Sequence, residues 1–239
     1  MSATKPRMFR GDKMKVQNMA FDENTFIVSD THFGHQKILE KEPHRFDDLS
    51  SKKEVFKRLR KRWNNLIQDN DTLLHLGDLI GDKGKKYIKK LKGHKYLILG
   101  NHDIKEQNFS VIQQSDFCII HGLCLLVPQK QEILEQMQFF LNNLPIEQQS
   151  LLSAVVADIC GIRILFSHYP LFDRYPNDNR FIAIKEILEK LFEISQCAMN
   201  IHGHTHSHDT FDNRCVNACI DKTDFMPIRL KDLLSKEGF

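Results

Sequence analysis

Long apolar runs are missing from this sequence of 239 residues. No uninterrupted hydrophobic stretch approaches the roughly 20 residues that a membrane-spanning helix needs, so we expect no membrane partner. The opening stretch MSATKPRMFRGDKMKVQ is basic and lacks the apolar centre of a secretory signal. The six cysteines form neither a CxxC pair nor a disulfide framework, which indicates reduced thiols. Together these absences predict a cytoplasmic protein.

Internal repeats and low-complexity tracts are missing as well, which argues against collagen-like chains, coiled coils and repeat arrays. The net charge of +3 is too small to identify a partner by itself. Hydrophobic residues make up 41% of the chain, and with this length they suffice for one sizeable core. We therefore expect a single α/β domain over residues 1–239.

Five short apolar runs each end in polar side chains. They are TFIVSD (25–30), TLLHLGD (72–78), KYLILGNHD (95–103), IRILFSHYP (162–170) and CAMNIHGHTH (197–206). Runs rich in Leu, Ile, Val and Phe are typical of strands buried on both faces. Because ligands of open α/β sheets bind beyond the carboxyl ends of the strands, the five ends predict contributions to one site.

Amphipathic helices are expected between these runs, since apolar side chains recur every three or four residues in 51–67, 85–93 and 181–195. Residues 128–158 fit the alternation poorly and suggest two helices broken at Pro145. We expect a helical insertion at about 128–158, within a core of about 25–225. The insertion either forms a lid or a dimer contact beside the site, or packs on the far side of the sheet.

The stretch IHGHTHSHD (201–209) holds four histidines, a spacing that suggests metal binding. The polar groups at the strand ends are Asp30, His32, Asp78, Asn101, His102, His168, His204 and His206. Such oxygen and nitrogen donors favour Mn, Fe or Zn over Ca or Mg, and the lack of cysteine argues against a structural zinc site. Two metals about 3.5–4 Å apart need a bridging carboxylate and roughly three more ligands each. This inventory can supply both sets.

A family resemblance rests on the order and spacing of these motifs. DxH at 30–32, GD at 77–78, GNHD at 100–103, the histidine of SHYP and GHTH at 203–206 resemble the calcineurin-like metallophosphoesterases over about residues 25–225. SDTHFGH, LGD and VNACIDKTDFMPIRLKDL look most like the small bacterial phosphoesterase branch. The resemblance implies an α/β fold, a β-sandwich flanked by helices in four α/β/β/α layers.

The resemblance also implies a role for each motif residue. The first metal would be held by Asp30, His32 and His206, the second by Asn101, His168 and His204, and Asp78 would bridge them. His102 would face the phosphate and either protonate the leaving oxygen or stabilise the transition state. Asp103 would orient His102. The implied cofactors are two divalent transition-metal ions, with Mn preferred and Fe, Zn or Ni as alternatives.

Three further histidines have competing interpretations. His35, just past the first ligand pair, is either a phosphate contact or an ordinary residue at a helix start. His202 is either a hydrogen-bonded neighbour of the ligands or without a function. His75 alternates with leucines inside a strand, so we expect it in the core.

The expected activity is hydrolysis of phosphodiester or nucleotide-like phosphate esters by a metal-bridging hydroxide, with a phosphodiesterase preferred over a monoesterase. One alternative is a nuclease that holds nucleic acid with the basic runs 52–62 and 83–95, although such runs are also typical of solvated helix faces. The other is a catalytically silent scaffold of the same fold, against which the filled ligand positions argue. A homodimer is a further possibility.

Overall fold

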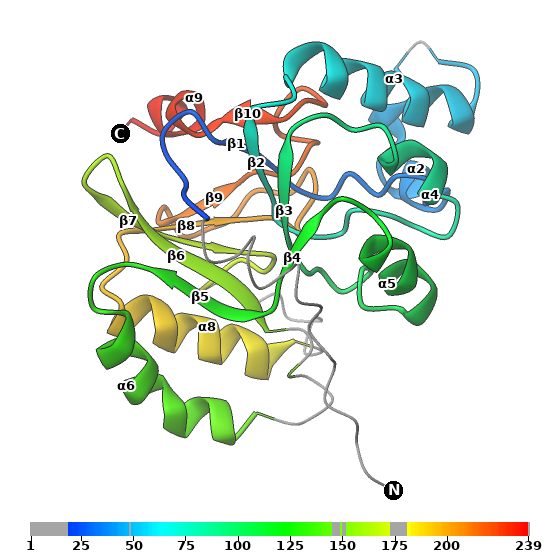
Figure 1. The fold of residues 1–239 in the computed structure, drawn as a ribbon. Coiled ribbons are helices and arrows are strands. Elements are labelled where there is room, and N and C mark those ends of the chain that lie inside the picture. Colours follow the sequence, from blue (N-terminus) through cyan, green and yellow to red (C-terminus); the bar gives the residue numbers. More distant parts are fainter. Residues whose placement is uncertain (1–18, 48, 145–148, 150–151, 173–180, 239) are drawn as a thin grey trace, which may run out of the picture.

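The computed structural model describes residues 19–47, 49–144, 149, 152–172 and 181–238. Two five-stranded sheets form its centre (Figure 1). The first has the order β10-β1-β2-β3-β4, in which β1 to β4 run parallel and β10 is antiparallel to β1. Its strands are β1 Phe26–Val28, β2 Thr72–His75, β3 His94–Ile98, β4 Cys118–Ile120 and β10 Ile228–Arg229.

The second sheet has the order β5-β6-β7-β8-β9 and is parallel except for the antiparallel pair β6 and β7. Its strands are β5 Gly122–Leu126, β6 Ser153–Ile159, β7 Ile162–Ser167, β8 Met199–His202 and β9 Cys215–Asn217. All five predicted apolar runs contain a strand, namely β1, β2 and β3 in the first sheet and β7 and β8 in the second.

Helices cover the outer faces of both sheets (Figure 1). Those packed on the first sheet are α3 Lys52–Leu66, α4 Lys85–Ile88 and α5 Glu106–Gln113, and those packed on the second are α6 Lys130–Asn142 and α8 Ile182–Ile194. The short elements α2 Ile38–Lys41 and η1 Pro43–Arg45 follow β1, and α9 Leu230–Lys236 follows β10. Among the described helices, none combines the length and apolarity that crossing a membrane requires.

Side-chain alternation along the strands produces the layers. In β1, Ile27 joins the core between the two sheets, while Phe26 and Val28 face the helices of the first sheet. In β6, Val155 joins the same central core, while Val156 packs toward α6 and α8. Both sheets are therefore buried on both faces, and the predicted four-layer α/β/β/α architecture is confirmed.

Capping fixes the start of the longest helix. α3 begins after Ser51, whose backbone is extended and whose hydroxyl accepts a hydrogen bond from the Glu54 amide at 3.3 Å. Its buried face carries Val55, Leu59 and Trp63, as the spacing in the sequence predicts.

The predicted insertion needs a correction. Its first half forms α6, but the second predicted helix is wrong, because Ser153–Ile159 is β6, paired with β5 and β7. The run LLSAVVAD spaces its apolar residues as a helix would, yet a short run buried on both faces cannot be told from a strand by periodicity. Pro145 lies outside the described residues. α6 packs beside α8 on the outer face of the second sheet, as the far-side alternative expected (Figure 1).

Candidate metal centre

The loops that follow β1, β2, β3, β7 and β8 meet where the two sheets approach each other. Ser29, after β1, forms a parallel bridge with Cys219, after β9. Its amide donates to the carbonyl of Ala218 at 3.0 Å, and its carbonyl accepts from the amide of Ile220 at 3.0 Å. This bridge joins the end of the first sheet to the end of the second. Donors from both sheets therefore converge, as the strand-end pattern predicts.

The first expected ligand set is assembled. Donor atoms of Asp30, His32 and His206 all lie within 4.8 Å of one another. Asp30 Oδ1 is 3.7 Å from His32 Nε2 and 3.8 Å from His206 Nε2. Asp30 Oδ1 and both ring nitrogens of His32 are buried and have no hydrogen-bond partner among the described residues. Because unpaired buried polar atoms are costly, a bound cation fits this donor set.

The second expected set surrounds the ring of His168. Its Nε2 lies 3.2 Å from Asn101 Oδ1 and 3.2 Å from His204 Nδ1. Its Nδ1 lies 2.9 Å from the carbonyl oxygen of Leu76, which can only accept, so Nδ1 carries the proton. Burial lowers the pKa of His168 to about 3 and keeps the ring neutral. Nε2 therefore presents a lone pair toward the amide oxygen of Asn101, and two facing acceptors fit a cation between them.

Asp78 lies between the two sets. Its Oδ2 is 3.4 Å from His32 Nε2, and its Oδ1 is 3.8 Å from His168 Nε2. Burial, and then the negative charges of Asp30 and Asp103, raise the pKa of Asp78 well above its ordinary value. A carboxylate with one oxygen toward each donor set has the geometry of a bridging ligand, and cations would compensate its buried charge.

Several of these donor residues have a left-handed backbone conformation, which sets the direction of their side chains. The donor residues with positive φ are Asp30 (55°), His32 (45°), Asp78 (55°), His204 (72°) and His206 (52°). Such conformations cost energy for residues other than glycine and cluster at functional sites. The turns after β1, β2 and β8 thus carry strain where these donors point into the centre.

Two motif glycines are steric requirements of the site. A Cβ at Gly100 would lie 2.3 Å from Asp78 Oδ1 and 2.9 Å from His168 Cε1. A Cβ at Gly203 would lie 1.9 Å from Ser29 Oγ and 2.4 Å from Asp30 Oδ2. Any side chain at either position would displace a ligand carboxylate or its neighbour. This explains why glycine precedes Asn101 and His204 in GNHD and GHTH.

The predicted role of Asp103 is wrong. Its carboxylate accepts hydrogen bonds from the backbone amides of Asp78 (2.7 Å), Gly100 (3.0 Å) and Leu79 (2.9 Å). No hydrogen bond joins it to the ring of His102 among the described residues. Asp103 turns inward and is fully buried, with its pKa raised by burial to about 7. Through these bonds Asp103 holds the loop that carries Asp78. The prediction failed because His102 and Asp103, although consecutive, point in different directions from this tight turn.

His102 is held by other groups. Its amide donates to Asp78 Oδ1 at 2.7 Å, and its carbonyl accepts from Asn108 Nδ2 at 2.8 Å. Its ring Nδ1 lies 3.1 Å from Lys105 Nζ. Burial, then the charge of Lys105, lowers the pKa of His102 to about 4. The ring is therefore neutral near pH 7.

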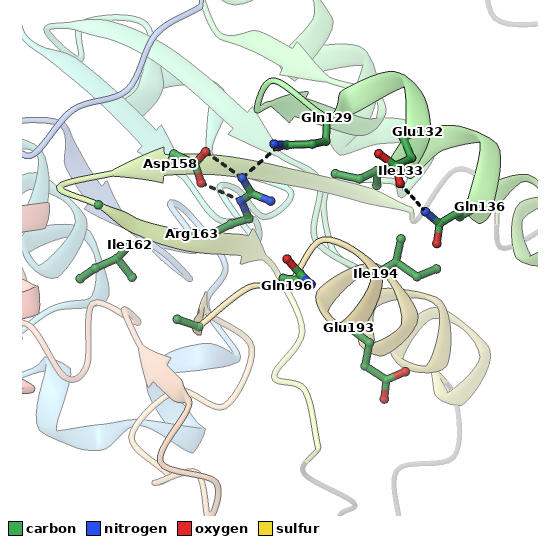
Figure 2. Close-up of a pocket in the computed structure, with 12 residues that line it drawn as sticks. Gln129, Glu132, Ile133, Gln136, Asp158, Ile162, Arg163, Glu193, Ile194 and Gln196 are labelled. Atoms are coloured by element: carbon green, nitrogen blue, oxygen red, sulfur yellow. Dashed lines mark hydrogen bonds and ion pairs between the residues drawn. The ribbon is translucent and has the colours of Figure 1, made fainter.

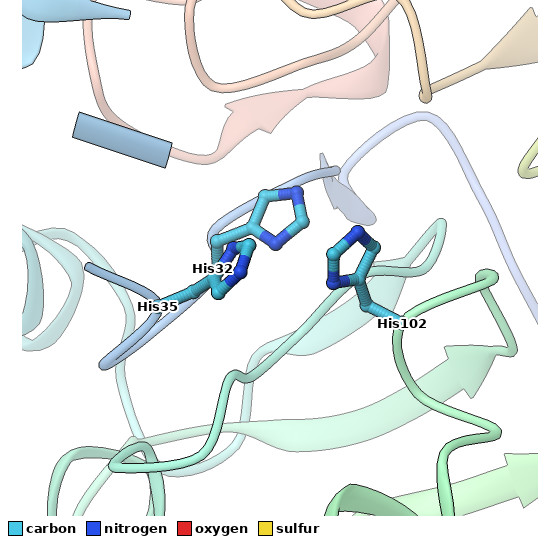
Figure 3. A group of neighbouring side chains, drawn as sticks. All are labelled: His32, His35 and His102. Atoms are coloured by element: carbon cyan, nitrogen blue, oxygen red, sulfur yellow. The ribbon is translucent and has the colours of Figure 1, made fainter. Parts of the chain in front are cut away.

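His35 joins His32 and His102 in a cluster of three imidazoles (Figure 3). The ring centroids of His35 and His102 are 4.7 Å apart, and those of His32 and His102 are 4.9 Å apart. His35 lies in the turn before α2, and its Nδ1 is buried without a hydrogen-bond partner among the described residues. The structure thus places this residue beside the ligand set, the position that a phosphate contact needs.

Sequence reasoning missed a buried ion pair beside the first ligand set. Asp221 Oδ2 lies 3.2 Å from His206 Nδ1 and is also bound by Arg45. Arg45 Nε donates to Asp221 Oδ1 at 2.7 Å, and its Nη2 donates to the carbonyl of Asp30 at 3.0 Å. Burial would raise the pKa of Asp221, but hydrogen bonds from His206 and Arg45 hold it at about 2. The sequence could have indicated Asp221, because it ends the apolar run NACID in the way that Asp30 and Asp78 end theirs.

Two other histidines lie outside the ligand sets. His75 is buried in β2, as predicted, and its Nδ1 accepts from the amide of Gly77 at 3.1 Å. Its Nε2 lies 3.0 Å from the hydroxyl of Thr31, which donates onward to the carbonyl of Leu79. His202 is buried in β8 with Nδ1 2.8 Å from the carbonyl of Gly203, so it supports the turn before His204.

A large cavity of about 920 Å³ lies away from this centre, between α6, α8 and the turn of β6 and β7 (Figure 2). Arg163 binds the carboxylate of Asp158 at 2.7 and 3.0 Å and the amide oxygen of Gln129 at 3.1 Å there. Arg163 stands at the start of β7, whereas His168 follows its end. The cavity therefore belongs to the opposite end of the sheet and contributes no ligand.

Comparisons with known proteins identify a matching family. The family model of the calcineurin-like phosphoesterases matches residues 24–208. An uncharacterized protein of Methanocaldococcus jannaschii is 37% identical over 104 residues, which cover 41% of this chain and 57% of that protein. The gene 66 protein of Mycobacterium phage L5 is 36% identical over 86 residues, which cover 34% of this chain and 40% of that protein. The chain thus matches between two fifths and three fifths of the length of these relatives.

A solved structure supports the fold independently. The protein of unknown function AQ665 from Aquifex aeolicus superposes with a TM-score of 0.59 at 23% sequence identity. The match covers 89% of this chain and 98% of that chain. At this identity the likeness shows a shared architecture.

Proposed function

Because the chain belongs to the calcineurin-like phosphoesterases, we propose that it is a metal-dependent phosphodiesterase with two divalent metal ions. The observation that carries this proposal is the position of Asp78, whose two carboxylate oxygens face two separate donor sets at 3.4 and 3.8 Å. Asp30, His32 and His206 would hold one ion, and Asn101, His168 and His204 the other. Nitrogen and oxygen donors without cysteine favour manganese, with iron, zinc and nickel as alternatives.

Two bound cations would lower the pKa of water and neutralise charge on the phosphoryl oxygens. The chain's own contribution on the substrate side is His102 and His35, which lie next to each other beside His32. Their imidazoles can donate hydrogen bonds to a phosphoryl oxygen or to the leaving oxygen. Asn101 binds through a neutral amide oxygen, so it adds no negative charge that would repel the substrate.

A phosphodiester or nucleotide-like ester suits this site better than a monoester. A diester carries one negative charge at its phosphorus, whereas a monoester carries nearly two near pH 7. Burial lowers the pKa values of His102 and His35, so both rings supply donors without adding positive charge. The two rings therefore add no charge that would select a second negative charge on the phosphoryl group, which supports the diester.

A nuclease is the second candidate, favoured by an exposed basic row on α3. Lys53, Lys57 and Lys61 stand four residues apart and are all exposed. Two other cations of the run are paired, since Arg58 binds Asp47 and Arg62 binds Asp224. This exposed row could hold a phosphate backbone through salt-sensitive contacts.

Metal analysis tests the proposal. We expect up to two transition-metal ions per chain after loading with manganese, because the two donor sets share Asp78. Asp78→Ala should empty or scramble both sites, whereas His32→Ala should mainly weaken one. Asp158→Ala removes a carboxylate at the opposite end of the sheet and should keep both ions. Full occupancy in Asp78→Ala, measured by elemental analysis, would rule out the bridging assignment.

A hydrolysis panel then identifies the substrate class. It compares a chromogenic diester, a chromogenic monoester, cyclic nucleotides, dinucleoside polyphosphates and single-stranded DNA, each with manganese, zinc and nickel. We expect the diester to be hydrolysed faster than the monoester. Cleavage of DNA that falls steeply with salt, and falls again in a variant with Lys53, Lys57 and Lys61 changed to Gln, would instead support the nuclease.

A further inference from the structure

The side chain that contacts the His102 ring nitrogen Nδ1 at hydrogen-bond distance is a cation rather than a carboxylate. Lys105 Nζ lies 3.1 Å from this nitrogen and belongs to the residue that caps the start of α5. A lysine ammonium has three N–H donors and no lone pair, so Nδ1 must be the acceptor. A neutral imidazole that accepts at Nδ1 carries its proton at Nε2.

We propose that Lys105 is a positioning residue that holds His102 in the Nε2–H tautomer and points this N–H toward the substrate phosphate. The inference rests on the proposed function. It assigns His102 the work of a neutral hydrogen-bond donor to the transition state. A neutral ring that gave up its Nε2 proton would be left as an imidazolate, so protonation of the leaving oxygen is not its task.

The backbone of His102 is held by hydrogen bonds on both sides. Rotation of its ring is therefore the main motion that Lys105 can restrict. The amide of His102 is bonded to Asp78, and its carbonyl is bonded to Asn108 at 2.8 Å. Asn108 is 2% exposed and also donates to the carbonyl of Ile80 at 3.1 Å. Lys105 and Asn108 stand three residues apart at the start of α5, so one end of one helix holds both the backbone and the ring.

Asp103 and Lys105 would set opposite tautomers. A carboxylate partner accepts from Nδ1–H and leaves Nε2 as a bare acceptor, which would repel a phosphoryl oxygen. The carboxylate of Asp103 is fully buried and already accepts from three backbone amides, so it is not available to the ring. The alternative of a third cation among His32, His35 and His102 is opposed by the ammonium of Lys105 beside the same ring.

Nitrogen NMR tests the tautomer in the metal-free full-length protein. The histidines are labelled with ¹⁵N, and the His102 signals are assigned by their loss in His102→Gln. We expect a protonated Nε2 and an unprotonated Nδ1 in the wild type and in Lys105→Arg, whose guanidinium also only donates. Lys105→Met should give a mixture of tautomers. A wild-type ring protonated at Nδ1 would overturn the proposal.

Lys41→Met is the matched control. The charge of Lys41 also acts on His35 and His102, but no hydrogen bond joins it to the His102 ring among the described residues. This variant therefore removes the same charge from the same surroundings and should keep the wild-type tautomer. Equal tautomer mixtures in Lys41→Met and Lys105→Met would show a general charge effect and would refute a specific positioning role.

Kinetics with the manganese-loaded protein give a second readout. Lys105→Met should lower kcat by about 2- to 10-fold, because only the fraction of rings that carries the Nε2 proton stays competent, with a much smaller change in KM. The loss should be equal for diesters with good and poor leaving groups, and Lys105→Arg should restore part of it. Added to His102→Ala, Lys105→Met should cause no further loss. Independent, additive losses would overturn the proposal.

The two readouts separate the inference from the proposed function. A wild-type protein that hydrolyses no phosphate ester while its His102 ring carries the Nε2 proton would refute the proposed function alone. Hydrolysis together with the other tautomer would refute the positioning role alone.

Discussion

Asp221 binds no metal in the proposed site, but it contacts one of the proposed ligands, His206. It accepts from the ring nitrogen of His206 that faces away from Asp30, and this contact fixes the direction of the other nitrogen. Arg45 binds the same carboxylate and also the carbonyl of Asp30, so it links Asp221 to the backbone of Asp30. The buried ion pair of Arg45 and Asp221 therefore orients the first donor set from the side opposite to its donor atoms.

Replacing Asp221 should weaken the first metal site selectively. We expect Asp221→Asn to lower manganese affinity at this site about 10- to 100-fold, because the amide removes the charge that stabilises the orientation of His206. The site around His168 should keep its affinity. Titration calorimetry measures both steps, and Asp224→Asn, which removes an exposed carboxylate three residues away, is the control. Equal weakening of both sites would contradict the role.

The residues of the site differ in how far their roles could be predicted from the sequence. The proposed metal ligands were predictable because each lies within a few residues of the end of an apolar run, a pattern that is local in the sequence. The direction of Asp103 was not, because a tight turn sends His102 outward and Asp103 toward the backbone amides. The contacts of Asp221 with Arg45 and His206 join positions far apart in the chain, and only the folded sheets bring them together.

Among the elements, α6 is a support of the second sheet. Its buried residues Ile133 and Met137 pack with α8 on the face of the sheet that points away from the first sheet. Periodicity predicted this helix, but it assigned the following run to a second helix. A helix buries one face, whereas β6 lies in the middle of a sheet and buries two.

A pair of substitutions on α6 tests its structural role. Met137 is fully buried and Phe139 is 72% exposed, two residues apart on the same helix. We expect Met137→Ala to lower the free energy of unfolding by about 2–5 kcal/mol, and Phe139→Ala to change it by less than about 0.5 kcal/mol. Denaturant unfolding measures both. Manganese affinity should be unchanged in each, and a loss of metal in Met137→Ala under native conditions would contradict a purely supporting role.

At the scale of the whole molecule, stability depends on burying uncharged histidines. Burial lowers the pKa of His75 to about 3, against an ordinary value near 6.5. Between these two values the unfolded chain binds a proton that the folded protein excludes. The contribution of His75 is therefore lost progressively as the pH falls below about 6.5.

Acid unfolding of His75→Phe tests this sign. The variant keeps an aromatic ring in β2 but cannot titrate, and it loses the hydrogen bonds to Gly77 and Thr31 at every pH. Between pH 6.5 and pH 4.5 the wild type should lose about 2 kcal/mol relative to the variant. Denaturant unfolding in the presence of a chelator measures the difference without linkage to metal binding. A gap that stays constant with pH would show that His75 is charged in the fold or uncharged in the unfolded chain.

The left-handed turns at the proposed metal centre restrict which substitutions this sequence can accept during evolution. In the proposed site, five residues each supply a donor atom and each also adopt a positive φ, namely Asp30, His32, Asp78, His204 and His206. Apart from glycine, the residues that occupy this backbone region most readily are Asn, Asp and His, which are also donors to divalent metals. Replacement by a β-branched residue such as Val, Ile or Thr therefore has two costs, which are backbone strain at positive φ and the loss of the carboxylate or imidazole donor atom. A lineage that abandons the chemistry while keeping the fold should show glycine or asparagine at these five positions first.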